Sequence, residues 1–353
     1  MNNLLTKHIL KESKNREDFR KILLTWYGKY QRELPWRTKP SLYKTVVSEF
    51  MLQQTRVSTV LPYFANWLKK FPSFTALAKA NEEDVLKGWE GLGYYSRARN
   101  LHKLAKTISP LKSIPKDAKF WLTLPGIGPY ASAAITSISF NQAEAVCDGN
   151  VVRVLTRIFS HGELFKDGAS AQKKLQPLAQ QLLDTTEPGN YNQGMMELGA
   201  TVCHRQSPLC TTCPVLSYCT SGQRGDPEMF PALAKKKKTF EKIKRYWITR
   251  DNALLLQRAK TGANRLAGIY ELPKDIESEV KNKKNLLAKK RRVIGQTDYE
   301  ESIYQFSLHL NCDLDKHSLE WISWDELKKI TISGPHRKWI EEIRRLFAEQ
   351  NFQ

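Results

Sequence analysis

The sequence predicts a mainly α-helical protein over its first two thirds and a smaller α+β domain after that. Apolar residues recur at helical spacing in 46–55, 147–159 and 191–203, whereas strand-like alternation begins only at 246–259. A chain of 353 residues is long enough for two or three domains, each with its own core. We therefore expect helical lobes first and a separate mixed domain last.

The composition indicates a polyanionic partner and a reducing compartment. Lysine and arginine exceed aspartate and glutamate by 56 − 36 = +20, an excess that favours nucleic acid. No apolar run approaches the roughly 20 residues needed to span a membrane. The first residues carry early charges and no apolar stretch, so we expect no secretory signal. The expected location is cytoplasmic, in association with the nucleoid, where disulfides are rare.

A cluster of cysteines indicates a metal site. Cys203, Cys210, Cys213 and Cys219 have the spacing C-x6-C-x2-C-x5-C and follow the predicted helix 191–203. Thiols this close in a reducing compartment favour a metal over two disulfides. Zinc sites usually pair two C-x2-C motifs, and only one occurs here. Iron–sulfur clusters also bind four thiolates, so the spacing favours iron–sulfur over zinc.

The segment 122–140 contains Leu-Pro-Gly-Ile-Gly-Pro-Tyr-Ala and continues into a helix of small residues. Gly126 and Gly128 allow a tight turn and leave backbone N–H groups accessible at the start of that helix. Such N–H groups favour an anion. The segment is typical of a helix–hairpin–helix, which grips a DNA phosphate without reading sequence. No strand precedes it, as a dinucleotide-binding turn would require.

Two acidic residues are candidates for catalysis. Asp148 stands directly before Gly149 at the start of the helix in 147–159, where N-capping is a common role for aspartate. Its place after the hairpin motif favours a functional role as well. Glu49 lies in the otherwise apolar helix 46–55. A carboxyl in apolar surroundings stays protonated to higher pH, which suits a general acid.

Together these motifs resemble those of the MutY-type adenine DNA glycosylases, in the helix–hairpin–helix superfamily of iron–sulfur DNA glycosylases. The resemblance covers about residues 20–222. It rests on LPWR at 34–37, SEFMLQQTRVSTVLPYF at 48–64, GWEGLGYYSRARNLH at 88–102, LPGIGPYA, VCDGNVVRVL and the cysteine spacing. It implies two helical lobes with DNA between them, and a 4Fe–4S cluster bound by Cys203, Cys210, Cys213 and Cys219.

The resemblance also implies separate roles for the two acids. Glu49 would protonate N7 of adenine and handle water, and Asp148 would stabilise the oxocarbenium ion, with covalent attachment left open. Two carboxyls with different tasks are the pattern of glycoside hydrolysis. Bifunctional relatives carry a lysine after the hairpin glycines, which forms a Schiff base, and Tyr130 stands there instead. We therefore expect a monofunctional enzyme that leaves an abasic site.

An enzyme that cuts a base from a duplex must first flip it out of the stack. The resemblance implies that Gln53, Gln54 and Thr55 form the intercalating segment and that Tyr94 is the wedge residue. Core packing is the alternative for Tyr94, which lies in a short apolar stretch. The remaining implied DNA contacts fall into three groups. The adenine pocket would be formed, with Glu49, by Trp36, Arg37, Leu52 and Gln193. Tyr130 and Asn150 would lie near the sugar, and Gly126 and Gly128 at the phosphate.

The chain changes character after the cysteines. We expect a helical domain at 1–222, with one lobe at about 34–140 and a second made from the N-terminus and about 141–222. A basic linker at 223–240, which includes a run of four lysines, then leads to a domain at 241–353.

An α+β architecture is predicted for that last domain. The sequence shows strand-like segments at 246–259, 265–275 and 303–314, a segment at 321–330 that leads into a helix, and a final helix at 335–347. The domain resembles the Nudix-like (MutT-like) C-terminal domain of the family, which reads 8-oxoguanine opposite the adenine. The Nudix hydrolase signature is absent, which favours recognition over hydrolysis.

Two departures from the family pattern occur in this domain. Arg265-Leu266-Ala267-Gly268 stands where the family has a Leu-Trp-Gly-Gly-like run. The family's Phe-Ser-His loop, which contacts the damaged base, corresponds to Phe306, Ser307 and His309, with the histidine one place late.

We therefore expect a monomer that removes adenine mispaired with 8-oxoguanine or guanine in double-stranded DNA. Two alternatives stay open. A glycosylase of the same fold acting on thymine or uracil opposite guanine would share the cluster and hairpin but lack the C-terminal domain. A non-catalytic iron–sulfur DNA-binding protein is the other, although an inactive relative should have lost Glu49 or Asp148.

Overall fold

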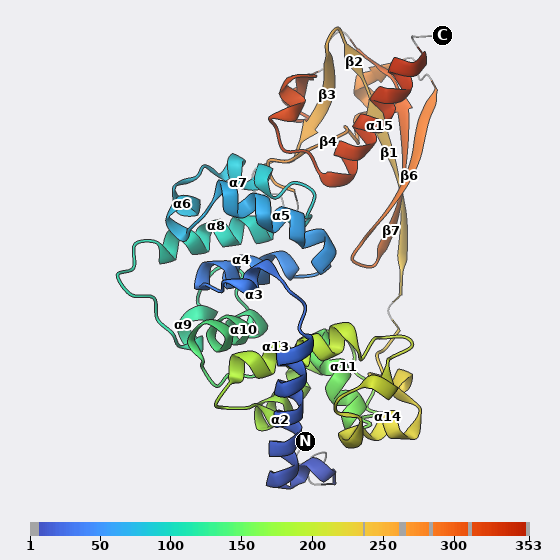
Figure 1. Ribbon diagram of the computed structural model, residues 1–353. Helices are drawn as coiled ribbons and strands as arrows, with labels where there is room; N and C mark the ends of the chain where they lie inside the picture. The colour runs from blue at the N-terminus through green and yellow to red at the C-terminus, as the bar shows by residue number, and fades with distance from the viewer. Residues whose placement is uncertain (1–6, 236, 261–265, 282–284, 310–312, 351–353) are drawn as a thin grey trace. The chain divides into compact units, whose positions relative to one another are not determined.

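A computed structural model describes residues 7–350 apart from 236, 261–265, 282–284 and 310–312 (Figure 1). The chain divides into two compact units, and each is discontinuous in sequence. The first unit comprises Met1–Gln53 and Pro110–Lys235, and the second comprises Gln54–Ser109 and Lys236–Gln353. The predicted limits of the domains at 1–222 and 241–353 stay a prediction.

The first unit is helical. Its described α-helices are α2 (Ser13–Tyr30), α3 (Pro35–Thr38), α4 (Leu42–Leu52), α9 (Ala118–Leu122), α10 (Pro129–Phe140), α11 (Gly149–Ile158), α12 (Gly168–Leu182), α13 (Pro188–Thr201) and α14 (Thr220–Arg224). Short 3₁₀ turns are η1 (Ile9–Lys11), η2 (Cys210–Thr212), η3 (Leu216–Tyr218) and η4 (Pro227–Met229). The predicted helices at 46–55, 147–159 and 191–203 correspond to α4, α11 and α13.

The core of this unit lies among α2, α11, α12 and α13. Helix α11 packs into this core because Val151, Val154, Leu155 and Ile158 recur at helical spacing and are all buried. Asp148 caps its first turn. The core therefore fixes the orientation of the helix that begins at Asp148.

The second unit contains helices and all the named strands of the described chain. Its helices are α5 (Val57–Lys70), α6 (Phe74–Lys79), α7 (Glu82–Gly88), α8 (Ser96–Ile108) and α15 (Gly334–Gln350), with turns η5 (Glu277–Glu279) and η6 (Glu326–Lys328). The strands are β1 (Thr239–Trp247), β2 (Thr249–Arg250), β3 (Ala253–Arg258), β4 (Tyr270–Glu271), β5 (Val280–Lys281), β6 (Leu286–Ile294), β7 (Thr297–Gln305), β8 (Ser307–Leu308) and β9 (Leu319–Ser323).

Small sheets form the β part of this unit. Strand β7 pairs in parallel with β1 and antiparallel with β6, while β3 pairs with β2, β4 and β9. Figure 1 shows the long strands β1, β6 and β7 beside one another, with α15 next to them. The fold class is confirmed: a helical first two thirds precedes an α+β domain, consistent with the Nudix-like domain that the resemblance implies.

Several predicted segments in the C-terminal part differ from the structure. In 265–275 only Tyr270–Glu271 is strand, and Arg265 lies outside the described residues. The segment 303–314 is divided between the end of β7 and β8, and 310–312 lies outside the described residues. The segment 321–330 forms the end of β9 and the 3₁₀ turn η6, and the α-helix that follows it, α15, begins at Gly334.

The ends of the predicted linker 223–240 are structured as well, since α14 and β1 extend into them. Among the residues that the structure describes, no helix combines the length and apolar character needed to cross a membrane.

Candidate active site and cysteine loop

Glu49 lies inside the first unit, on helix α4. The Ser41 side chain caps α4 by accepting a hydrogen bond from the backbone N–H of Lys44. The helix then buries Val46 and Phe50 together with Glu49, whose side chain is only 6% exposed. Its Oε2 atom has no hydrogen-bond partner among the described residues. Burial of the carboxyl raises the pKa of Glu49 to about 7.

Three polar groups face Glu49. Hydrogen bonding by the phenol of Tyr130 on α10 and the charge of Arg37 on α3 both lower the pKa of Glu49 against the dominant effect of burial. The same phenol donates to Met196 Sδ at 3.6 Å. The nearby charge of Asp148 raises the pKa of Glu49 further. Helices α3, α4 and α10 and the start of α11 thus bring Arg37, Glu49, Tyr130 and Asp148 together.

Asp148 is the N-cap that its position in the sequence predicts, and its charge also acts on Glu49. Its Oδ1 accepts the backbone N–H of Val151 at 2.8 Å and caps α11, and its Oδ2 accepts Asn150 Nδ2 at 2.9 Å. Burial raises the pKa of Asp148, and the hydrogen bonds from Val151 and Asn150 oppose that rise. The two hydrogen bonds hold the Asp148 carboxyl in one position near the buried carboxyl of Glu49.

Arg153 is a positioning residue that the sequence reasoning missed. Its Nη2 donates to Asn150 Oδ1 at 2.8 Å and to the carbonyl of Gly199 at 2.7 Å, while its Nε donates to the carbonyl of Cys203 at 2.7 Å. A Cβ added to Gly199 would lie 2.6 Å from the Asn150 Cβ, so the two helices touch here. Arg153 therefore links the Asp148 end of α11 to the first cysteine.

Glu197 is a second group that the sequence reasoning missed. It is 1% exposed and accepts Arg32 Nε at 2.6 Å and Arg37 Nη2 at 3.0 Å. Burial would raise the pKa of Glu197, but the hydrogen bonds from Arg32 and the charge of Arg37 outweigh it, so the pKa is lowered. Arg37 Nε also donates to Gln193 Oε1 at 3.2 Å. Gln193 and Glu197 are four residues apart and therefore lie on one face of α13. This spacing could have indicated that Glu197 lies beside the predicted pocket residue Gln193.

Other predicted DNA-contact residues lie on α3, on α4 and in the chain directly after α4. Trp36 is buried in α3, Leu52 ends α4, and Gln53 is the C-cap of α4. Gln54 follows with a positive φ of 58°, and Thr55 is half-buried. The intercalating role of Gln53, Gln54 and Thr55 stays a prediction.

The hairpin motif has the predicted form. Gly126 adopts a φ of 78°, which favours glycine, between α9 and α10. Gly128 precedes Pro129 at the start of α10, and a Cβ added to Gly128 would meet nothing within 4 Å. The backbone N–H groups at this helix start are thus open to an anion such as phosphate.

Four further predicted contact residues belong to the second unit. Tyr94 is 51% exposed and has a φ of 48°, so it is not the core residue that its short apolar surroundings allowed. Phe306 is 7% exposed and packs against Tyr246 inside the C-terminal core. Ser307 lies in β8, and His309 is exposed with its backbone N–H bonded to the carbonyl of Glu279.

Residues 203–219, here called the cysteine loop, lie against the core of the first unit. Cys203, Cys213 and Cys219 pack against that core, and all four thiols of the loop are free and partly buried. Arg157, buried in α11, donates from Nη1 to Cys203 Sγ at 3.2 Å and to the His204 carbonyl at 2.6 Å. The Gly222 N–H donates to Cys219 Sγ at 3.4 Å.

Four thiolates are the ligand set of an iron–sulfur cluster, and the residues present fit that group. Arg157 and the Gly222 N–H donate to Cys203 Sγ and Cys219 Sγ, and such donors stabilise the negative charge of thiolates that bind a cluster.

Comparison with known proteins agrees with this geometry. A family model described as HhH-GPD superfamily base excision DNA repair protein matches residues 47–181. A human adenine DNA glycosylase is 44% identical over 238 residues, which are 64% of this chain but only 43% of that relative. The matched part of this chain therefore spans less than half of the human protein.

Two other relatives extend the comparison. A solved structure of a thermostable thymine-DNA glycosylase is 27% identical, with a TM-score of 0.52, and covers 60% of this chain and 98% of its own. An adenine DNA glycosylase of Buchnera aphidicola subsp. Acyrthosiphon pisum is 31% identical over 348 residues, or 93% of this chain and 98% of the relative. Because this last match runs through nearly all of both proteins, the chain belongs to the MutY-type adenine DNA glycosylase family of the helix–hairpin–helix superfamily.

Proposed function

We propose that this protein is a DNA repair glycosylase that hydrolyses the N-glycosidic bond of adenine mispaired with 8-oxoguanine or guanine in duplex DNA. The observation that carries the proposal is the state of Glu49. Its buried carboxyl has a pKa of about 7 and a buried Oε2 with no partner among the described residues. Near neutral pH about half of such groups carry a proton that they can donate.

The reaction needs two opposite electrostatic environments. As the bond breaks, negative charge develops on the adenine and positive charge on the sugar. Neutral Glu49 protonates N7 of the flipped adenine, which makes it a better leaving group. Ionised Asp148, held by Val151 and Asn150, stabilises the oxocarbenium ion. Glu49, now a carboxylate, takes a proton from the water that attacks the sugar carbon, and this regenerates the acid.

Tyr130 supports a monofunctional outcome. Its phenol bonds to Glu49 and offers no amine for a Schiff base with the sugar. The product is therefore an abasic site with an intact strand. The exposed Tyr94 acts as the wedge that fills the stack, and Arg37, Gln193 and Trp36 shape the adenine pocket.

The cofactor and the opposite base complete the proposal. A 4Fe–4S cluster on Cys203, Cys210, Cys213 and Cys219 would tie the loop into one rigid body beside α11. Support comes from the donors to Cys203 and Cys219. The C-terminal domain reads 8-oxoguanine, with Ser307 and His309 on the candidate loop. The net charge of +20 suits double-stranded DNA as the partner.

The test uses a labelled duplex with one adenine opposite 8-oxoguanine. Wild type and Asp148→Asn are incubated with it, and each sample is split with and without alkali. We expect nicking only after alkali, and none with Asp148→Asn. A duplex with thymine opposite guanine tests the alternative substrate. Cleavage there but not at adenine, or tight binding with no cleavage at all, would contradict the proposal.

A further inference from the structure

The loop Trp89–Tyr95, here called the wedge loop, holds Tyr94 in an uncommon conformation. Tyr94 has a φ of 48°, and Gly91 and Gly93 have φ of 101° and 71°. Arg97 is buried and donates from Nη2 to the carbonyl of Gly93 at 3.0 Å. A backbone with this much positive φ keeps one shape only where its surroundings fix it.

A salt bridge from helix α15 helps to fix the wedge loop. Arg337 on α15 binds Glu90 of the wedge loop with two nitrogens, Nε to Oε1 at 2.5 Å and Nη2 to Oε2 at 3.3 Å. The side chains are only 21% and 11% exposed. Arg337 also donates from Nη1 to the carbonyl of Leu327 at 2.7 Å, so its guanidinium is held in place.

Hydrogen bonds from two side chains to backbone carbonyls and one close approach of the backbones reinforce this contact. The Tyr95 phenol donates to the carbonyl of Ile332 at 3.2 Å, and Lys87 Nζ donates to the carbonyl of Ile330 at 2.8 Å. A Cβ added to Gly334 would lie 3.3 Å from the Gly91 Cα, so the two backbones nearly touch. The wedge loop, together with Lys87 at the end of α7, thus contacts one continuous stretch, Ile330–Arg337, which we call the docking segment.

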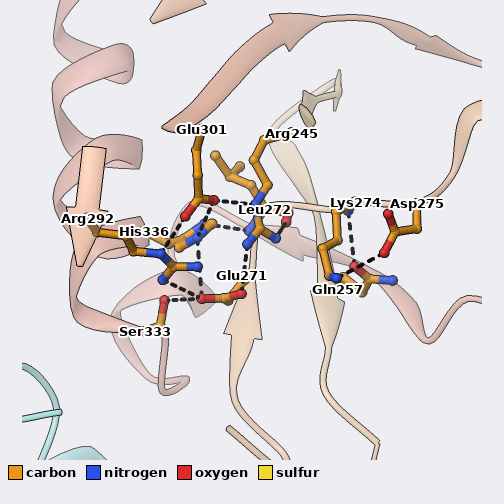
Figure 2. Close-up of polar contacts among 10 residues, drawn as sticks. All are labelled: Arg245, Gln257, Glu271, Leu272, Lys274, Asp275, Arg292, Glu301, Ser333 and His336. Atoms are coloured by element: carbon orange, nitrogen blue, oxygen red, sulfur yellow. Dashed lines mark hydrogen bonds and ion pairs between the residues drawn. The ribbon is translucent and has the colours of Figure 1, made fainter. Parts of the chain in front are cut away.

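The docking segment is itself anchored in the C-terminal core, as Figure 2 shows. Ser333 Oγ donates to Glu271 Oε1 at 2.8 Å, and the Leu272 N–H donates to His336 Nδ1 at 3.0 Å. Glu271 also pairs with Arg245 at 3.1 Å, inside a buried network of paired charges. The docking segment therefore moves with the C-terminal domain.

We propose that Glu90 and Arg337 are positioning and specificity residues, which couple the C-terminal domain to Tyr94. This inference rests on the proposed function, in which the C-terminal domain reads 8-oxoguanine and Tyr94 is the wedge. When the C-terminal domain binds the opposite base, the docking segment and the salt bridge fix the position of Tyr94. Loss of the bridge should therefore slow adenine removal more opposite 8-oxoguanine than opposite guanine. A general loss of stability would slow both reactions alike.

The test measures single-turnover rates of adenine removal from both duplexes. We expect Arg337→Gln and Glu90→Gln each to lower the rate opposite 8-oxoguanine about tenfold, which is about 1.4 kcal/mol in the barrier. The rate opposite guanine should fall no more than about twofold. The double variant should lose no more than Glu90→Gln alone, because Glu90→Gln already removes the bridge to Arg337 as well as the one from Lys87 Nζ to Glu90 Oε2 at 2.6 Å. Arg337→Lys, which keeps the charge, should recover part of the loss.

Two controls separate positioning from folding. Asp84→Asn removes an exposed ion pair between Lys70 Nζ and Asp84 Oδ1, 2.7 Å apart, in the same unit, and should leave both rates unchanged. In a Tyr94→Ala background, Arg337→Gln should have no further effect, since the residue through which it acts is gone. The melting temperature of each variant is followed alongside.

The outcomes are distinct. A selective loss that vanishes in the Tyr94→Ala background supports the coupling. An equal loss on both duplexes, an undiminished loss in that background, or no loss from Arg337→Gln overturns it and leaves the proposed function standing. A wild type that removes no adenine from either duplex overturns the proposed function, and this inference with it.

Discussion

The phenol of Tyr130 on helix α10 lowers the pKa of the buried carboxyl of Glu49 on helix α4 by hydrogen bonding to its ionised form. This contact joins the hairpin motif, which is open to a phosphate, to the group that we propose as the general acid. The bond stabilises the ionised form of Glu49 and therefore limits how far burial raises its pKa. Tyr130 thus adjusts the acid while it takes the place of the lysine of bifunctional relatives.

Replacing Tyr130 with phenylalanine should move the pKa of Glu49 upward. The substitution removes the hydrogen bond that lowers this pKa and leaves the burial that raises it. We expect the alkaline limb of the pH–rate profile to shift to higher pH. Tyr191→Phe is the matched control, because the buried Tyr191 hydroxyl has no hydrogen-bond partner among the described residues. An unmoved or lowered limb for Tyr130→Phe would show that the phenol does not act on Glu49.

Glu49 should also make folding stability depend on pH. Its folded pKa of about 7 lies above the ordinary value of 4.5, so the folded state binds more protons between these values. The stabilising effect of its proton is complete below about pH 4.5 and is lost as pH rises through 7. Above that, the buried carboxylate costs about 3 kcal/mol. Denaturant unfolding should find Glu49→Gln more stable than wild type at pH 8 and equal to it near pH 4. A difference that is the same at both pH values would argue against this ionisation.

Arg153 should be needed for activity although it lies behind Asp148. Arg153→Met removes the donors to Asn150 Oδ1 and to the carbonyl of Cys203. With Asn150 free to move, Asp148 loses a fixed partner, and we expect about a tenfold fall in single-turnover rate. Arg20→Met is the control, because Arg20 also donates to backbone carbonyls in the first unit, those of Leu182 and Gln181. Equal effects of the two substitutions would reduce Arg153 to a general structural role.

Metal removal should loosen the loop before it unfolds the protein. The cysteine loop has no α-helix of its own between Cys203 and Cys219, and Arg157 reaches only its first residues. Cys203→Ser should lower the iron content and raise hydrogen exchange in 203–219, while α11 stays protected. Cys147→Ser, at a buried thiol outside the loop, should keep the iron. Full iron content in Cys203→Ser would exclude that thiol as a ligand.

The sequence predicted the elements of the site because each has a local signature. Gly126 and Gly128, the acid at a helix start and the cysteine spacing are patterns within a few residues. The sequence did not predict the roles of Arg153 and Glu197, because their partners, Cys203 and Arg32, lie far away in the chain. No local pattern separates such a buried ion pair from a charge on a solvated helix face.

The C-terminal part was harder to predict for a related reason. Strand β7 pairs with β1 in parallel, and the contact is set by tertiary packing instead of a hairpin. Short strands such as β4 and β8, of two residues each, carry no periodicity that a sequence can show. Phe306 matched a family loop by position, yet its ring fills the core.

The most direct test of the account is the pH dependence of adenine removal under single-turnover conditions. We predict a rate that rises as Asp148 ionises and falls through an apparent pKa of about 7 as Glu49 loses its proton. Glu49→Gln should show no measurable excision at any pH. A wild-type rate that stays constant from pH 6 to pH 9, or a Glu49→Gln variant that still excises adenine, would contradict Glu49 as the general acid.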